Sequence, residues 1–577
     1  MKDKLSRILC TALCLTPLLA SAQNSEKKTS PDRLFQEGQA LFRQKAFPAS
    51  LTPLQAYLEQ MRKAGNPLPA TGNIEEAEYM LVCAQYELHS PNSTALLLEF
   101  LEENPDTPHA NRIHALIASN YFYAEDYDAA LARFQAARLD RLGNEERNDM
   151  TYRLATCYLR TGDVKEAAVW FETLREVSDK YAADCTYYLS YIRYTQKQYD
   201  DALQGFLSLQ EDSKYRALVP YYIAEIYLAK QNYDKAEIVA QNYLSAYPDH
   251  EYTAEMYRVQ GTADYHAGKY QEAMNALEQY RKETGDPDCR RDALYMLGIS
   301  CYECGVYTEV PATLGEVTTE DDALTQNAWL HIGLASLQLD DRNKARMAFE
   351  QASISDADLK VKEQAAYNYA LCIHETSYSA FGESVTVFEK FLNEFPNSQY
   401  ADQVSGYLVE VYMNTRSYDA ALTSIERIAH PGKAILEAKQ KILFQLGTQS
   451  FANTQFEEAV GYFNRSVELG QYNLLTKAEA LYWRGESYYR LNRMQEAARN
   501  FTDYLALTPQ KNTEMYPLAH YNLAYIAFHA KDYATAQSRF MQFVQLQKGD
   551  NAAILADAYN RIADCYLHNR RFDEARQ

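Results

Sequence analysis

The sequence predicts an all-α fold, a right-handed superhelical solenoid built from helix–turn–helix hairpins. A small residue recurs along the chain and is followed twelve residues later by alanine, as in Ala118 with Ala130 and Ala224 with Ala236. The unit that carries this pair returns every 34 to 39 residues from about Ala84 onward. In most units an aromatic residue follows the alanine by four positions. A repeat of this length is typical of stacked hairpins that share one continuous core.

The unit at residues 221–248 shows why each half is helical. Apolar and small residues around Ala224 recur at the spacing of one helix face. Asp234 then stands in the first turn of a second helix, where the helix dipole favours an anion. We expect Ala224 and Ala236 to be small because the two helices cross there, and larger side chains would push them apart. Pro248 lacks a backbone donor and ends the second helix.

The same register recurs along the chain. The small position of the first helix holds Ala118, Ala155, Ser190, Ala224, Gly261, Gly298, Gly333, Ala370, Gly447, Gly485, Ala524 and Ala563. The alanine of the second helix is Ala130, Ala167, Ala202, Ala236, Ala273, Ala345, Ala421, Ala459, Ala497, Ala536 and Ala575. The aromatic residue is Phe134, Phe171, Phe206, Phe349, Phe388, Phe463, Phe501 and Phe540. This pattern resembles the tetratricopeptide repeat, and the resemblance implies an array of about 13 repeats with a concave groove.

The predicted organisation has four parts. They are a signal peptide at residues 1–22, a polar tether at 23–32, two degenerate helical hairpins at 33–105, and the array at 106–577, whose last repeat is incomplete. Because the chain ends inside a second helix, we expect it to be a fragment of a longer protein. A capping helix is the usual end of such an array.

The array departs locally from its pattern. Val310 replaces the alanine and Pro311 stands where a second helix should form, so Tyr307–Ala323 is the least secure unit and a candidate bend. The later repeats are spaced 38 or 39 residues apart, whereas earlier spacings are 34 to 37. We therefore expect a change of curvature near 370–400.

The N-terminus has the features of a secretory signal. Basic residues come first, an apolar run extends over 8–19, and Ala20 and Ala22 form a small-x-small cleavage site. The apolar run is too short for a spanning helix, which needs ~20 residues, and no later segment is long and apolar enough. The sequence therefore predicts an exported protein with no membrane span. Neither Cys10 nor Cys14 directly follows a small residue, which argues against lipid attachment.

The charge and the motifs exclude several functions. The net charge of −21 repels nucleic acid and would attract basic partners or cations. The sequence contains no HExxH, GxSxG or phosphate-binding loop motif, so we expect no enzyme, no cofactor and no metal site. The eight cysteines beyond the signal peptide mostly fall at buried helix positions, so we expect them to pack in the core, although an even number also permits disulfides. The CxxC at Cys301 and Cys304 lacks the context of a redox fold or a zinc site.

The groove carries the more specific signal. In tetratricopeptide repeats it is lined by first-helix residues three before, one after and four after the small position. These positions hold Tyr187, Tyr191, Tyr194, Tyr295, Tyr302, Tyr482, Glu486, Tyr489, Tyr521, Tyr525 and Phe528. Relatives that clamp a peptide carboxylate use Lys and Asn here, and only Asn560 matches. Tyrosines with interspersed Glu225, Glu410 and Glu486 suit an extended, basic or aromatic-rich peptide, because aromatic rings attract Lys and Arg. The alternative is that some of these tyrosines pack against the adjacent repeat.

Two stretches resemble a narrower group. Residues 388–403 (FEKFLNEFPNSQYADQ) and 98–123 resemble the joint between repeats in periplasmic repeat proteins, namely the outer-membrane β-barrel assembly lipoproteins and the Tol–Pal coordinators. The resemblance implies a protein-binding scaffold in the periplasm or on the periplasmic face of the outer membrane of a diderm bacterium. Two alternatives stay open: an accessory protein of carbohydrate or nutrient uptake, whose tyrosines stack on sugars, and a scaffold part of a longer multidomain protein.

Overall fold

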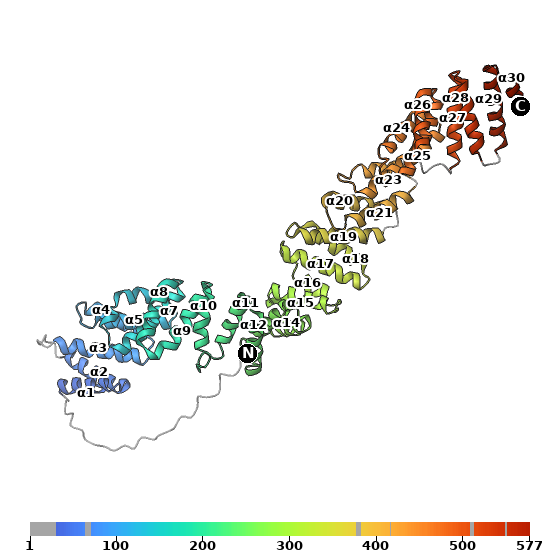
Figure 1. Ribbon diagram of the computed structural model, residues 1–577. Helices are drawn as coiled ribbons and strands as arrows, with labels where there is room; N and C mark the ends of the chain where they lie inside the picture. Colours follow the sequence, from blue (N-terminus) through green and yellow to red (C-terminus); the bar gives the residue numbers. More distant parts are fainter. Residues whose placement is uncertain (1–29, 64–70, 377–381, 416, 508–512, 548–550) are drawn as a thin grey trace. The chain divides into compact units, whose positions relative to one another are not determined.

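A computed structural model describes residues 30–63, 71–376, 382–415, 417–507, 513–547 and 551–577. These residues form thirty α-helices, three short 3-10 helices and no β-strand (Figure 1). The all-α prediction is therefore confirmed. The chain divides into two compact units, unit 1 at Met1–Tyr247 and unit 2 at Pro248–Gln577. The signal peptide and most of the predicted tether lie outside the described residues.

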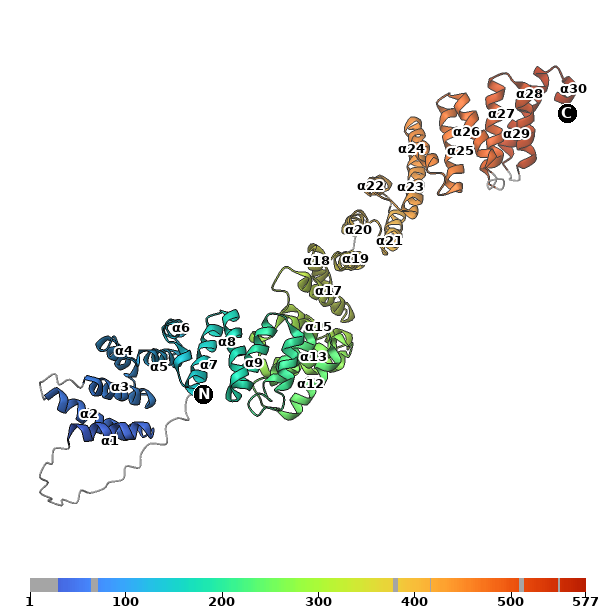
Figure 2. The same cartoon turned by 60° about the vertical axis from the view of Figure 1, so that its left-hand side comes forward.

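Unit 1 is a series of helices in which each packs mainly against those before and after it. Its helices are α1 (Pro31–Arg43), α2 (Phe47–Lys63), α3 (Thr71–Glu87), α4 (Ser93–Glu103), α5 (Ala110–Tyr123), α6 (Tyr127–Ala136), η1 (Leu139–Arg141), α7 (Asn144–Arg160), α8 (Val164–Val177), η2 (Asp179–Tyr181), α9 (Ala182–Thr195), α10 (Tyr199–Ser208), α11 (Val219–Ala229) and α12 (Tyr233–Ala246). Figure 2 shows α7, α8 and α9 side by side as consecutive antiparallel helices. Because α1 begins at Pro31, the last two residues of the predicted tether are helical.

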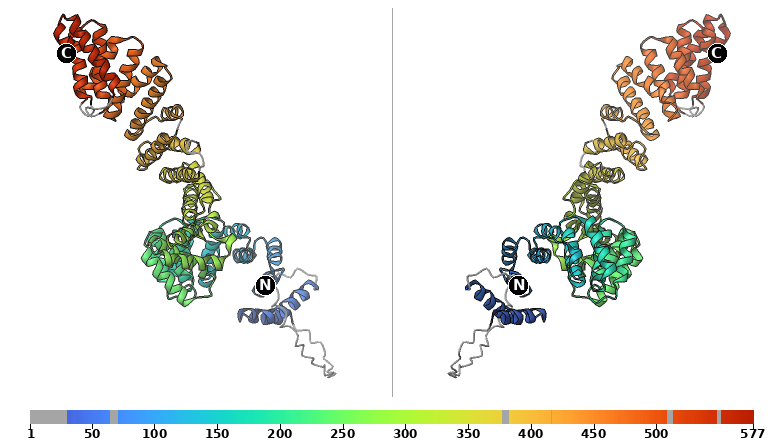
Figure 3. Two further views of the ribbon diagram at one scale, coloured as in Figure 1. Left: turned by 90° about the vertical axis from the view of Figure 1, so that its right-hand side faces the viewer. Right: turned by 90° about the vertical axis from the view of Figure 1, so that its left-hand side faces the viewer.

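Unit 2 continues the same alternation. Its helices are α13 (Thr253–His266), α14 (Tyr270–Thr284), η3 (Asp286–Asp288), α15 (Arg291–Glu303), α16 (Val310–Gly315), α17 (Ala323–Gln338), α18 (Arg342–Ile354), α19 (Leu359–Thr376), α20 (Glu383–Glu394), α21 (Ala401–Asn414), α22 (Tyr418–Ile425), α23 (Lys433–Ala452), α24 (Phe456–Glu468), α25 (Leu474–Arg490), α26 (Met494–Ala506), α27 (Met515–His529), α28 (Tyr533–Leu546), α29 (Ala552–His568) and α30 (Phe572–Arg576). Figure 3 shows the red C-terminal helices of this unit lying side by side. The predicted change of curvature near 370–400 stays a prediction, and residues 377–381 in that stretch lie outside the described part.

Where the small position of a first helix is glycine, it receives a side chain from the second helix of the same hairpin. A Cβ added to Gly333 would lie 2.5 Å from Cε1 of Phe349, and one added to Gly447 would lie 2.6 Å from the same atom of Phe463. Both phenylalanines are fully buried. In each hairpin the ring comes sixteen residues after the small residue, so the glycine is needed for the ring as well as for the helix crossing.

The turn between the two helices of a hairpin has a fixed backbone conformation that the sequence analysis did not identify. Seven residues after the small position, the chain adopts a positive φ, as at Gly162, Lys197 and Thr454. Left-handed backbone costs little at glycine but roughly 1–2 kcal/mol at other residues. The same position also holds Glu125, Gln231, Gly268, Gly305, Asp340, Asn492, Lys531 and Arg570.

The unit around Pro311 is shortened, as its sequence indicated. Helix α16 has only six residues, with Pro311 in its first turn, where proline removes no hydrogen bond of the helix. Val310 and Leu314 are fully buried there. The hairpin thus keeps its core contact while losing most of the second helix.

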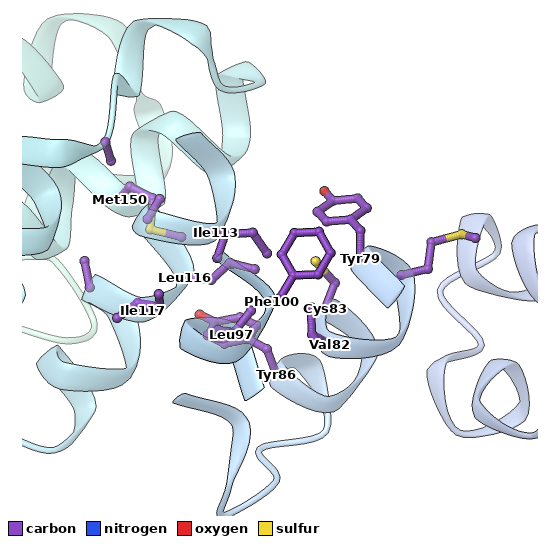
Figure 4. Packing of buried hydrophobic residues seen from close by; sticks show 14 of the residues in the cluster. Tyr79, Val82, Cys83, Tyr86, Leu97, Phe100, Ile113, Leu116, Ile117 and Met150 are labelled. Atoms are coloured by element: carbon purple, nitrogen blue, oxygen red, sulfur yellow. The ribbon is translucent and has the colours of Figure 1, made fainter. Parts of the chain in front are cut away.

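The cysteines of the described residues are free thiols, and most are buried in the core. Cys83, for example, lies among Tyr79, Phe100 and Ile113 in the cluster that joins α3, α4 and α5 (Figure 4). Burial raises the pKa of the Cys83 thiol to about 12, so the thiol is protonated at neutral pH. Cys301 is 2% exposed, and burial raises its thiol pKa to about 11. These thiols act as small apolar core groups.

A helix needs both length and apolarity to span a membrane. No helix in the described ranges is long and apolar enough to cross one.

Candidate functional site: the tyrosine-lined faces

The predicted groove residues of α9 lie together around a tyrosine of α11. The ring centroids of Tyr187, Tyr191 and Tyr194 lie 6.1, 5.9 and 5.5 Å from that of Tyr222, all near edge-to-face. Tyr222 itself stacks on Phe206 at 5.0 Å. Such ring pairs stabilise packing by about 0.5–1.5 kcal/mol each beyond the buried area. The cluster is half-buried, so it presents ring edges and leaves few open ring faces.

The tyrosine three positions before the small residue serves mainly to join neighbouring hairpins. Tyr187 stacks on Tyr215 of the following loop, with ring centroids 4.7 Å apart. The same contact occurs at Tyr152 with Tyr181 (4.6 Å) and at Tyr367 with Tyr400 (4.2 Å). This face of each ring is therefore occupied by the next repeat, which is the packing alternative that the sequence left open.

Charged groups reinforce two of these joints in unit 1. Lys180 Nζ and the Tyr181 hydroxyl both donate to Asp149 Oδ1, at 2.7 and 2.9 Å. Lys214 Nζ donates to Asp184 Oδ1 at 2.6 Å, and the Tyr215 hydroxyl donates to the same oxygen. A Lys-Tyr pair between two hairpins thus binds an aspartate in the first helix of the preceding hairpin, which is α7 for Asp149 and α9 for Asp184.

Helix α15 places Tyr295 and Tyr302 differently from each other. Burial, together with the Tyr265 hydroxyl, raises the pKa of Tyr295. Tyr302 lies near Tyr307 and His331, with ring centroids 5.6 and 5.3 Å away. Both tyrosines are half-buried. Tyr302 therefore makes edge-to-face contacts with the rings of Tyr307 and His331.

Helix α25 contributes one core residue and two half-buried residues of the predicted set. Tyr482 is only 4% exposed and packs against Phe501 and Tyr504, so its predicted place in the groove is corrected to the core. Glu486 is half-buried, and its Oε1 accepts hydrogen bonds from Asn522 Nδ2 and, at 3.3 Å, from the Tyr482 hydroxyl. Burial raises the pKa of Glu486 despite these donors. Tyr489 is half-buried one turn further along the same helix.

Helices α27 and α29 share an aspartate bound by two tyrosines. The Tyr521 hydroxyl donates to Asp557 Oδ2 at 2.6 Å, and the Tyr525 hydroxyl donates to the same oxygen. Burial alone would raise the pKa of Asp557, but the two hydroxyls and Arg561 lower it. The pKa of each tyrosine is raised, by burial and by the Asp557 carboxylate. At neutral pH the aspartate is therefore ionised and both phenols keep their protons.

An arginine and a second aspartate complete this cluster. Arg561 Nε lies 3.6 Å from Asp557 Oδ1, and Arg561 Nη1 lies 2.6 Å from Asp564 Oδ2. Its guanidinium stands 5.8 Å from the ring centroid of Phe528. The side chains of Asp557, Arg561 and Asp564 are 33%, 33% and 37% exposed, so solvent reaches all three. Two carboxylates and one guanidinium give the cluster a net negative charge.

We call the partly exposed set Glu486, Tyr489, Tyr521, Tyr525, Phe528, Asp557, Arg561 and Asp564 the C-terminal acidic-aromatic face. It can accept a cationic group at its carboxylates and pack apolar carbon against its ring edges. Among the described residues, no three His, Cys, Asp or Glu side chains are grouped to hold a metal ion.

The sequence missed three residues that shape these faces. Asp557 stands six positions before Ala563, one further turn along the register that gave the predicted set. Extending the register by that turn would have found it. Tyr222 and Arg561 stand two positions before their small residues, where sequence periodicity places them beside the core. Their roles depend on contacts with neighbouring hairpins, which no pattern within one repeat reveals.

The fold and the repeat register together define an all-α repeat solenoid. Three stretches of it match tetratricopeptide repeat models: residues 115–183 and 444–512 match one family model of that description, and residues 221–250 match a second. Comparison with curated proteins gives no significant match.

Similar solved structures include a tetratricopeptide repeat protein from Parabacteroides merdae ATCC 43184, at 16% identity and a TM-score of 0.31, covering 46% of this chain and 99% of that one. A second is the APC/C hetero-tetramer Cut9-Hcn1, at 14% identity and a TM-score of 0.24, covering 92% and 96%. A third is Naa15/Naa10 bound to HypK-THB, at 18% identity and a TM-score of 0.28, covering 81% and 67%. With TM-scores below 0.5, none of the three identifies a partner for this chain.

Proposed function

We propose that the protein is a non-enzymatic scaffold that binds an extended peptide segment of another protein, basic or aromatic-rich, through the C-terminal acidic-aromatic face. Tetratricopeptide repeats bind protein partners, which supports the general role. The single observation that carries the specific proposal is the ionised Asp557 held by Tyr521 and Tyr525, beside the exposed Asp564.

The chemistry of this face favours a cationic peptide over other ligands. A lysine or arginine of the partner can pair with Asp564, and its alkyl stem can lie along the ring of Phe528. Net negative charge on the face and a chain charge of −21 both attract such a partner at long range. A peptide carboxylate would meet Asp557 and Asp564 instead and would be repelled.

Sugar binding has weaker support in the structure. Stacking on a sugar requires an open ring face, and the face of Tyr187 is covered by Tyr215 at 4.7 Å. Tyr222 likewise stacks on Phe206. The hydroxyls of Tyr521 and Tyr525 already donate to Asp557, and the Tyr187 hydroxyl donates to that of Tyr222.

We also propose that the protein works in the periplasm, or on the periplasmic face of the outer membrane, of a diderm bacterium. The basic start, apolar run and small-x-small site of residues 1–22 support export. The joint-like stretches at 98–123 and 388–403 support an envelope scaffold by resemblance only. Fractionation of the native cells tests this part independently of binding.

Fluorescence anisotropy with matched peptides tests the binding proposal. The probes are a labelled ten-residue peptide with alternating lysine and tyrosine, and its counterpart with glutamate in place of lysine. We expect the basic peptide to bind and the acidic one not to bind, with affinity falling as salt rises because the face is solvent-accessible.

Asp564→Asn should lower the affinity for the basic peptide about tenfold, which corresponds to ~1.4 kcal/mol of binding free energy. Glu496→Gln is the matched control, since Glu496 is an exposed carboxylate on the second helix α26. Equal binding of both peptides, or equal losses in both variants, would show that this face does not select the partner.

A further inference from the structure

A cavity of about 670 Å³ lies in unit 1, apart from the tyrosine-lined faces. Its lining comes from α6, the joint that contains η1, α7 and α8. Helix α6 has ten residues whereas α8 has fourteen, so the joint rather than a further turn of α6 faces the last turn of α8. The volume falls within the range of sites for small organic ligands, about 300–1,000 Å³.

The floor and walls of this cavity are apolar. Leu139, Leu154 and Leu174 line it and are at most 9% exposed. Trp170 and Tyr158 add aromatic surface. Val177 lines the cavity at the end of α8 while remaining 60% exposed. An apolar wall that opens to solvent at one side suits a ligand with an apolar body and a polar end.

The polar lining carries positive charge. Arg138 and Arg147 both line the cavity, and Asp140 is the one carboxylate among the lining residues. The Arg138 side chain is 62% exposed, and its Nε is 4.0 Å from Asp140 Oδ1. Arg147 Nη2 donates to the neutral Asn144 Oδ1 at 2.9 Å. In a chain of net charge −21, two guanidinium groups against one carboxylate form a local site for an anion.

We propose that this cavity binds a small amphipathic carboxylate, with an aromatic or alkyl body against Leu154, Trp170 and Leu174 and its carboxylate at Arg138 and Arg147. This binding site is additional to the peptide face. It stands whether or not the C-terminal acidic-aromatic face binds peptide.

Isothermal titration calorimetry on the full chain tests the proposal with matched probes. The probes are 4-phenylbutyrate and its uncharged counterpart 4-phenylbutan-1-ol, with decanoate as an alkyl-bodied acid. We expect the acids to bind with one-to-one stoichiometry and the alcohol to bind at least tenfold more weakly. Absence of binding by either acid would overturn the proposal, and equal affinities for acid and alcohol would overturn the assigned carboxylate.

Two pairs of surface variants locate the binding and leave the fold intact. Arg138→Ala should lower the affinity for 4-phenylbutyrate at least fivefold. Arg141→Ala should leave the affinity unchanged, because Arg141 lies in the same joint without lining the cavity. Val177→Gln should lower this affinity by a similar factor. Val169→Gln should not change it, because Val169 is as exposed on the same helix but lies outside the cavity. Equal effects within either pair would place the ligand elsewhere and overturn the proposal.

Discussion

At the scale of single residues, the glycine of a first helix and the ring sixteen positions later form one packing unit. Gly447 belongs to α23 and Phe463 to α24, and the ring occupies the space that a Cβ would need. Gly461 is also helical, in α24, but nothing lies within 4 Å of the position of its Cβ. Packing therefore requires a glycine at position 447 but not at position 461 of the same hairpin.

We predict opposite effects of the same substitution at these two glycines. Gly447→Ala should destabilise the hairpin by about 1–3 kcal/mol, because the buried ring of Phe463 must move. Gly461→Ala should stabilise it by about 0.5–1 kcal/mol, because alanine loses less backbone entropy in a helix. Urea denaturation followed by circular dichroism measures both, and a gain in stability from Gly447→Ala would refute this packing.

A second residue-scale prediction concerns His520 of α27. The side chain is 7% exposed, and burial, with Arg539 3.1 Å from its Nδ1, lowers its pKa to about 4. The unfolded chain has the higher pKa, near 6.5, and so binds the proton first. Stability is therefore complete above pH 6.5 and falls as pH drops toward 4, by about 3 kcal/mol.

The measurement is the unfolding midpoint of the wild type and of His520→Gln between pH 7 and pH 4.5. Glutamine does not titrate, so the variant should lose less stability than the wild type over this range. Parallel pH profiles for the two proteins would argue against a buried neutral histidine.

At the scale of elements, the turn between the two helices contains one left-handed residue in the array hairpins whose turn lies among the described residues. Glycine fills that position at Gly162, Gly268 and Gly305, whereas Thr454 fills it with φ of 63°. A β-branched residue is poorly suited to this conformation. Thr454 therefore carries local backbone strain that the hairpins with glycine at this position avoid.

Exchanging the residues at this turn position should shift stability in both directions. Thr454→Gly should stabilise its hairpin by about 1 kcal/mol, and Gly268→Thr should destabilise its own by about the same amount. Thermal unfolding of the two variants against wild type measures this. Destabilisation by Thr454→Gly would mean that the threonine side chain makes a contact worth more than the strain.

The sequence predicted the elements better than the site, for a physical reason. The small residue, the alanine and the ring each report a contact inside one hairpin, so their spacing predicted the helices. The site depends on which neighbouring side chains cover each tyrosine. Tyr482 lies in the core against Phe501 and Tyr504, whereas Tyr187 is half-buried with one ring face covered by Tyr215. Such partners stand at variable distances along the chain, and no fixed period reveals them.

At the scale of the molecule, each helix packs chiefly against its sequence neighbours, so stability is a sum of local terms. Helix α16 has six residues, whereas the second helices of the hairpins before and after it, α14 and α18, have fifteen and thirteen. We expect it to open more readily than the helices around it.

Hydrogen exchange followed by mass spectrometry measures this opening. Amides of 310–315 should exchange faster than those of the second helices α14 and α18 at the same pH and temperature. Protection of α16 equal to that of α18 would show that the buried Val310 and Leu314 compensate fully for the missing turns.

Photocrosslinking tests the proposed binding of a basic peptide to the first-helix face of α25, α27 and α29. A photoreactive phenylalanine is placed at Tyr525, or at the exposed Gln495 of α26 as a control, and each variant is irradiated with the labelled basic peptide. We expect a crosslinked adduct from position 525, lost on adding Asp564→Asn, and none from position 495. Adducts from position 495 alone, or equal adducts from both positions, would show that the peptide does not bind this face.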